Sequence, residues 1–99
     1  MGSHSIDPRA YEAYLKGRFY WHQRTPDSLQ QALQQFQQPL NIDPTYAAAY
    51  AGLADTYNLM GNFDLLPAKV ALERAMAAAQ KAGAERARTR GAGAPRPVG

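Results

Sequence analysis

The stretch Tyr50-x-x-Leu53-Ala54-x-x-Tyr57 repeats, with substitutions, an earlier stretch of the same chain, Tyr14-x-x-Gly17-x-x-Tyr20. At an offset of 37 residues, Gly17 and Tyr20 of the earlier copy align with Ala54 and Tyr57 of the later one. Self-similarity at a period of about 20 to 50 residues is typical of repeat proteins, in which each unit buries its hydrophobic face against the next unit. The sequence therefore predicts two stacked copies of one structural unit.

Three pairs of a capping residue and a proline mark the expected beginnings of helices: Asp7-Pro8, Thr25-Pro26 and Asp43-Pro44. In each pair the first side chain can accept from free backbone N–H groups, and the proline stands where its missing N–H costs nothing. We expect a fourth helix to begin at Pro67. Pro39 is expected to kink or end the second helix just before itself, and Gly61 to close the third in a left-handed conformation.

Apolar residues recur at steps of three and four, which is the helical period. The first two helices would bury Tyr11, Tyr14, Leu15, Phe19 and Trp21, and then Leu29, Ala32, Leu33, Phe36 and Leu40. The last two would bury Tyr46, Tyr50, Leu53, Tyr57 and Met60, and then Ala68, Leu72, Ala75, Met76 and Ala79. Short links favour antiparallel neighbours, so the sequence predicts an all-α fold of two tandem helix–turn–helix repeats, about 8–43 and 44–82.

Composition divides the 99 residues into three parts. Residues 1–5 read as a leader added for expression, and 6–82 form the expected helical repeat domain. Residues 83–99 are mostly Gly, Ala, Arg and Pro, so they have little to bury and are expected to be a disordered tail. Basic and acidic side chains balance up to Ala82, and the net charge of +3 resides in the tail. We therefore expect no specific nucleic-acid binding.

Cysteine is absent, which excludes disulfides and thiolate metal sites and fits a reducing compartment. The longest uninterrupted apolar run is far too short to span a bilayer, so we expect no membrane segment and a cytoplasmic protein.

The chain from about 7 to 82 resembles the tetratricopeptide repeat family, whose repeat is a pair of antiparallel helices. Four residues of the second repeat match the family's W-x2-L-G-x2-Y pattern: Tyr50, Leu53, Ala54 and Tyr57. Five residues of the first repeat match the family: Gly17, Tyr20, Ala32, Phe36 and Pro44. Pro39 departs from it, because it replaces the last small residue of the second helix. The chain looks like the divergent repeats of large multidomain bacterial regulators, where they follow a winged-helix DNA-binding domain, a cyclase or a protein kinase.

The resemblance implies a partner-binding groove, because in that family the first helix of each repeat lines the concave surface. Carried over to this chain, the groove would present Tyr11, Tyr14, Arg18, Trp21, His22, Ala51, Asp55 and Asn58. The family members that grip the carboxylate tails of heat-shock chaperones use Lys and Asn there. The matching places here hold other residues, so the resemblance implies no chaperone-tail clamp.

Several residues with possible chemistry also have structural explanations. His22 and Asp27 could form an acid–base pair, but a surface histidine and a capping aspartate explain both. Trp21 could be a peptide-binding hot spot or could fill the junction of the first two helices. The aspartates match no metal-ligand spacing, so we expect no metal, no cofactor and no enzymatic activity.

Three glutamine pairs, Gln30-Gln31, Gln34-Gln35 and Gln37-Gln38, could form a polar zipper. They alternate with the apolar stripe, so a solvated helix face is the expected arrangement. That face has no charge between Asp27 and Asp43, which makes it a possible packing surface for another chain.

Together these features predict a non-catalytic interaction module, a fragment of a larger protein that binds a partner protein or peptide in the concave groove. The alternative is a structural spacer or a self-association element that forms a homodimer through the uncapped last helix, because repeat arrays usually need three units and a polar cap.

Overall fold

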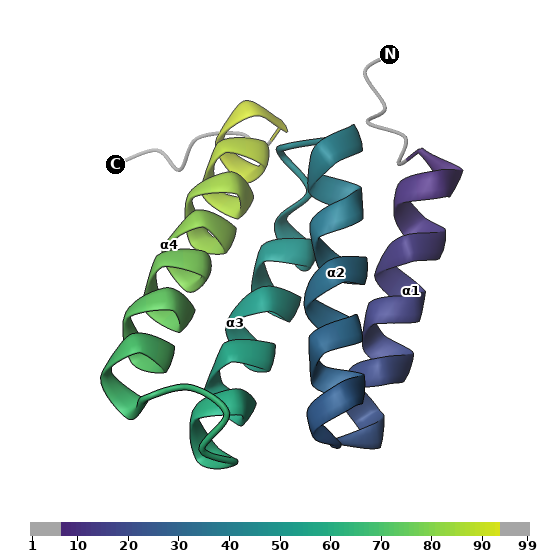
Figure 1. The fold of residues 1–99 in the computed structure, drawn as a ribbon. Helices are drawn as coiled ribbons and strands as arrows, with labels where there is room; N and C mark the ends of the chain where they lie inside the picture. The colour runs from purple at the N-terminus through teal and green to yellow at the C-terminus, as the bar shows by residue number, and fades with distance from the viewer. Residues whose placement is uncertain (1–6, 94–99) are drawn as a thin grey trace.

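The computed structural model describes residues 7–93, with side chains described for residues 7–88. Within that part the chain forms four helices and no strand: α1 (Pro8–Gln23), α2 (Pro26–Ile42), α3 (Ala47–Asn62) and α4 (Ala68–Gly93). α1 packs against α2, α3 packs against α4, and α2 joins the two pairs by packing on α3 (Figure 1). The predicted all-α fold of tandem helical hairpins is confirmed. The expected leader, residues 1–5, lies outside the described residues.

The first two helices begin at the predicted caps. Asp7 accepts from the backbone N–H of Arg9 at 2.8 Å, and the Arg9 side chain donates to the same carboxylate. These bonds hold the pKa of Asp7 below its ordinary value. At α2 the Thr25 hydroxyl accepts from the backbone of Ser28 at 3.0 Å, and the Ser28 hydroxyl accepts from the backbone of Thr25 at 2.8 Å. This reciprocal capping box satisfies two N–H groups that would otherwise lack partners.

The third predicted cap is wrong, because Asp43 follows the end of α2 and does not begin α3. The backbone N–H and the hydroxyl of Thr45 both donate to Asp43 Oδ1, at 3.0 and 2.6 Å. Asp43 thereby shapes the turn between the helices. α3 begins at Ala47, after Tyr46, whose side chain makes no capping bond.

Of the two effects expected of Pro39, a kink or an end of the helix, the end is wrong: α2 does not end at Pro39. It continues to Ile42, and the Pro39 carbonyl accepts from the backbone N–H of Asp43 at 2.7 Å. A proline close to a helix end removes one hydrogen bond but leaves the following bonds intact. The Pro39 ring is fully buried, and burial of its apolar surface offsets that loss.

Gly61 does not close α3 in a left-handed conformation, because α3 continues to Asn62 and ends before Phe63. The residue with positive φ in this link is Asp64, at 59°. A Cβ built on Gly61 would lie 2.7 Å from the Cβ of Ala71. Glycine is therefore needed here for the close approach of α3 and α4.

The core centres on Phe36 of α2, which is 1% exposed. Cβ atoms built on Gly17 of α1 and Gly52 of α3 would lie 2.7 and 2.5 Å from its ring. The two glycines thus leave the space that the ring fills. The predicted stripe of α2 is confirmed, with Leu29 and Ala32 fully buried. On α1, by contrast, the buried face consists of Ala10, Ala13 and Gly17, and the larger Tyr11, Leu15 and Phe19 are 47–62% exposed.

The prediction of a disordered tail from residue 83 is wrong for residues 83–93, because α4 continues to Gly93. Residues 94–99 lie outside the described residues. Once a helix is nucleated, each added residue gains a hydrogen bond, and Ala, Glu and Arg are strong helix formers. The segment 84–88 consists entirely of these three residue types. Local helix propensity therefore orders a segment that has little apolar surface to bury.

The inward face of α4 also differs from the prediction. It consists of Ala71, Ala75, Ala78 and Ala82, whereas Leu72 and Met76 are 56% and 52% exposed. Among the predicted residues Ala75 is thus confirmed, and Ala68, Leu72, Met76 and Ala79 point outward. Small side chains on this face allow α4 to approach α3 closely at Gly61.

Candidate functional site

Three of the predicted groove residues lie around one small pocket between α1 and α3. Arg18, Trp21 and Asp55 line a cavity of about 80 Å³, with Phe36 and Gly52 completing the wall. The indole Nε1 of Trp21 is buried and has no hydrogen-bond partner in the structure. The pocket therefore combines a cation, a carboxylate and an indole that packs beside the core.

Tyr14, another predicted groove residue, belongs largely to the packing between the helices. Its ring centroid lies 5.8 Å from that of Phe36 and 5.6 Å from that of Tyr46. Its hydroxyl accepts from the Arg18 guanidinium at 3.4 Å. Tyr14 thereby helps to position Arg18.

The remaining predicted residues do not line this pocket. Tyr11, His22 and Asn58 are exposed, and Ala51 is half-buried. The edge of the His22 ring packs on Trp21, with centroids 5.1 Å apart. The Arg24 guanidinium lies 5.1 Å from the indole centroid. Trp21 therefore contacts both His22 and Arg24.

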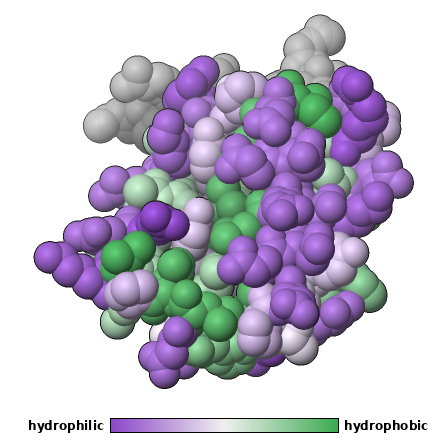
Figure 2. All heavy atoms as spheres, in the orientation of Figure 1, coloured by the Kyte–Doolittle hydropathy of each residue, from purple (hydrophilic) through white to green (hydrophobic). Residues whose placement is uncertain are grey.

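A larger groove lies between α2 and α3, and sequence reasoning did not predict it. It measures about 360 Å³ and is lined by Leu33, Gln34, Gln37, Gln38, Leu53 and Tyr57. We call it the α2–α3 groove. In Figure 2 hydrophobic atoms over α3 lie beside hydrophilic atoms over α2, and hydrophobic atoms also appear over the beginning of α4. The glutamines at 34, 37 and 38 are exposed, so the predicted solvated face is confirmed there.

Two basic side chains of α4 lie over tyrosine rings of α3, and one of these rings, that of Tyr57, lines the groove. The Arg74 guanidinium lies 5.9 Å from the ring centroid of Tyr57, and the Lys81 ammonium lies 5.9 Å from that of Tyr50. A cation over an aromatic face gains about 0.5–1 kcal/mol at an exposed site. The charged ends of both basic side chains thus lie over rings of α3, and both residues are exposed.

Arg88 continues this line of cations, and we call Arg74, Lys81 and Arg88 the basic row. Successive members are seven residues apart, which is close to two helical turns, so they share one face of α4. Tyr50 and Tyr57 on the antiparallel α3 have the same spacing. That common spacing is the sequence signal that could have revealed the row.

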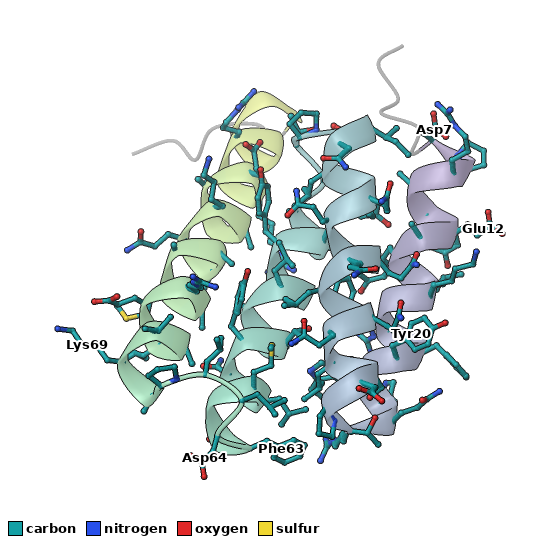
Figure 3. The ribbon with its side chains drawn as sticks, viewed as in Figure 1. Asp7, Glu12, Tyr20, Phe63, Asp64 and Lys69 are labelled. Atoms are coloured by element: carbon teal, nitrogen blue, oxygen red, sulfur yellow. The ribbon has the colours of Figure 1, made fainter. Side chains whose placement is uncertain are left out.

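Figure 3 shows the ends of the helix pairs, with Asp7 at the beginning of α1 and Phe63 and Asp64 in the link between α3 and α4. Lys69, near the beginning of α4, points away from α3. Residues 7–88 contain no group of three or more His, Cys, Asp or Glu side chains that could hold a metal ion. None of the described helices is long and apolar enough to cross a membrane.

Comparison with known proteins finds similarity to transcriptional regulators. The chain is 38% identical over 69 residues to the transcriptional regulator HilA of Salmonella typhimurium, and equally to HilA of Salmonella typhi. It is 44% identical over 54 residues to HilA of Salmonella paratyphi A. The first two matches cover 70% of this chain and 12% of the relative, so the chain spans about an eighth of those proteins. No family model and no solved structure matches the chain.

These matches correct two expectations from the sequence. The expected function was a partner-binding interaction module or, alternatively, a spacer or self-association element, and the relatives are instead transcriptional regulators. The expected partners were a protein, a peptide or a second copy, without specific nucleic acid. Because transcription takes place on nucleic acid, the exclusion of a nucleic-acid partner is wrong.

Proposed function

We propose that this chain is a helical regulatory segment of a bacterial protein that controls transcription. The observation that carries the proposal is the 38% identity to the transcriptional regulator HilA, which extends over 70% of the chain. The match is longer than any single helix of the structure, since α4, the longest, has 26 residues. It therefore includes residues from more than one helix and the packing between them.

The segment acts without chemistry of its own. The described side chains include no metal-binding cluster, and no sequence motif pairs a nucleophile with a base. We assign the two helix pairs to the tetratricopeptide repeat family on the residue pattern, and we place the protein in the cytoplasm, where bacterial transcription occurs. The chain spans about an eighth of the length of these relatives. We extend the proposal to the protein as a whole, which would control transcription.

A chimera tests the proposal. In the Salmonella regulator the matched segment is replaced by the aligned residues of this chain, and a reporter gene under the regulator's control is measured. A second strain carries the regulator with the segment deleted. We expect the deletion to abolish regulation and the chimera to restore a measurable part of it, because the same packed helices are supplied.

Two controls make the outcome interpretable. Immunoblotting shows whether each regulator accumulates to the same level. A chimera with Gly52→Leu tests whether regulation needs correctly packed helices or only a segment of the same length. Leucine at this position collides with the Phe36 ring, which lies 2.5 Å from a Cβ built on Gly52. The proposal fails if the chimera accumulates normally and regulates no better than the deletion, or if the deletion leaves regulation unchanged.

A further inference from the structure

We propose that the face of the molecule formed by the α2–α3 groove and the basic row of α4 binds the phosphate backbone of double-stranded DNA. This inference deepens the proposed function and rests on it, because it names the partner that a regulatory segment would contact. It is argued from charge, spacing and the polar groups beside the row.

The charged side chains on this face are mostly basic. Arg74 is exposed beside Tyr57 of the groove, Lys81 is exposed beside Tyr50, and α2 carries no charged residue between Asp27 and Asp43. The carboxylate of α3, Asp55, lines the pocket on a different face of that helix. A face with exposed cations and few opposing carboxylates attracts a polyanion and releases its counterions.

One acidic residue of α4, Glu85, offsets the charge of Arg88, so the charge of the row rests mainly on Arg74 and Lys81. Glu85 pairs with Arg88 at 3.5 Å, and the Glu85 side chain is 15% exposed while that of Arg88 is 70% exposed. Glu73 precedes Arg74 and so lies about 100° away from it around the helix. The cations thus dominate the accessible surface of the row.

The spacing of the row fits a polymer of regularly placed charges. At about 1.5 Å rise per residue, cations seven residues apart are separated by about 10 Å, and the row extends over about 20 Å. Duplex DNA presents one phosphate per strand every 3.4 Å or so along its axis, so the row covers about six base pairs. Contacts with the tyrosine rings restrict the conformations of the Arg74 and Lys81 side chains. These side chains therefore lose less conformational entropy when they bind DNA.

The groove beside the row supplies neutral hydrogen-bonding groups. Gln34, Gln37 and Gln38 are exposed, and glutamine side chains commonly donate to phosphate and sugar oxygens of DNA. Such contacts fix the position of a protein on the duplex without reading its sequence. We therefore expect binding that depends strongly on salt and little on base sequence.

Fluorescence anisotropy with the full 99-residue chain tests this assignment. Two labelled duplexes of about 20 base pairs and unrelated sequence are titrated between about 50 and about 200 mM salt. The row variant is Arg74→Gln/Lys81→Gln. The matched control is Lys69→Gln/Arg86→Gln, which removes the same charge from the same helix; Lys69 points away from α3. The other arginines are present in both variants, so their contributions cancel.

We expect the native chain to bind both duplexes with similar affinity. The row variant should bind both about tenfold or more weakly at the lowest salt, with a slope of log K against log salt that is smaller by about 2. The control should bind like the native chain, and Arg74→Lys/Lys81→Arg should retain binding. Circular dichroism establishes that each variant is folded.

Three results would overturn the assignment. The first is absence of duplex binding by the native chain. The second is an equal loss in the row variant and in the control, which would indicate net charge alone. The third is competition by polyglutamate that is as effective as competition by unlabelled duplex, which would indicate an acidic protein partner.

The reporter assay separates this inference from the proposed function. A chimera that carries residues 7–93 of this chain and regulates normally with Arg74→Gln/Lys81→Gln would overturn the DNA contact and leave the regulatory role standing. A chimera without regulation, made from a chain that binds duplex through the row, would overturn the regulatory role and leave the contact standing.

Discussion

At the scale of single residues, the fit of Phe36 between two glycines decides how closely the helices pack. Its ring leaves no space for a Cβ on Gly17 or Gly52. Protein interiors are packed as densely as organic crystals, so one methyl group added at such a place changes the stability of the fold. The same two glycine positions bring α1 and α3 to the same side chain of α2, and thereby close the pocket of Arg18 and Asp55.

Replacing Gly52 by alanine should destabilise the protein by up to about 2 kcal/mol. Overpacking lowers the free energy of unfolding by about 1–3 kcal/mol, and the higher helix propensity of alanine offsets about 1 kcal/mol of this loss. Gly83→Ala, where a Cβ meets nothing within 4 Å, should instead stabilise the helix by about 0.5–1 kcal/mol. Urea unfolding followed by circular dichroism measures both. A Gly52→Ala protein as stable as Gly83→Ala would contradict the packing of Phe36.

The phenol of Tyr46 should make stability sensitive to high pH. Burial raises its pKa, and neighbouring Tyr14, Tyr11 and Asp43 add to the effect. The resulting stabilisation is complete below the unfolded pKa of about 10 and is lost as the pH rises through the higher folded pKa. Between about pH 9 and about pH 11.5 the native chain should lose more unfolding free energy than Tyr46→Phe. An equal loss in the native chain and in Tyr46→Phe would refute the prediction.

At the scale of the helices, α4 shows how a neighbour fixes which face is buried. Judged by hydrophobicity, Leu72 and Met76 would face inward, yet the interface with α3 consists of alanines. Close approach at Gly61 excludes larger side chains from that interface. The orientation of α4 in turn places Arg74 and Lys81 beside the tyrosines of α3.

The same substitution at two positions, one turn apart on α4, tests this orientation. Ala75 is 3% exposed and faces α3, whereas Ala79 is exposed. Ala75→Leu should therefore cost about 1–3 kcal/mol through overpacking, and Ala79→Leu should change stability by less than about 0.5 kcal/mol. Thermal unfolding of the two variants measures the difference. If Ala79→Leu were the damaging change, α4 would be rotated from the orientation described here.

At the scale of the whole molecule, the core is unevenly distributed over the helices. It draws large side chains from α2 and α3, such as Phe36 and Leu53, but α4 contributes alanines. Apolar burial stabilises by about 25 cal/mol per Å², so an alanine face anchors a helix weakly. The exposed Leu72 and Met76 add little to this anchoring.

Amide hydrogen exchange should therefore be slowest in α2 and fastest in α4. Local opening costs less free energy where fewer apolar contacts are lost. We expect the amides around Phe36 to exchange only on global unfolding, and those of α4 to exchange through an opening that leaves the other helices intact. Mass spectrometry of peptic fragments resolves the two segments. Equal protection of α2 and α4 would show that the four helices open as one unit.

The sequence by itself determined the helices, their order and much of the core. Capping at Asp7 and Thr25 and the stripe of α2 are local patterns, and local patterns can be read without knowing the neighbours. It also determined that Arg18, Trp21 and Asp55 could meet, because the resemblance placed them on the inner helices. It did not give the pocket's floor, since Phe36 and Gly52 enter it through packing between helices.

The tertiary structure alone decided the rest, because packing against neighbouring helices determines which of several locally possible arrangements the chain adopts. Asp43 could cap α3 or shape the preceding turn, and the link geometry selected the turn. α4 could bury its large residues or its alanines, and the close contact with α3 selected the alanines. The position of Arg74 beside the α2–α3 groove follows from that choice, because the groove and its basic neighbour are formed by side chains of three different helices.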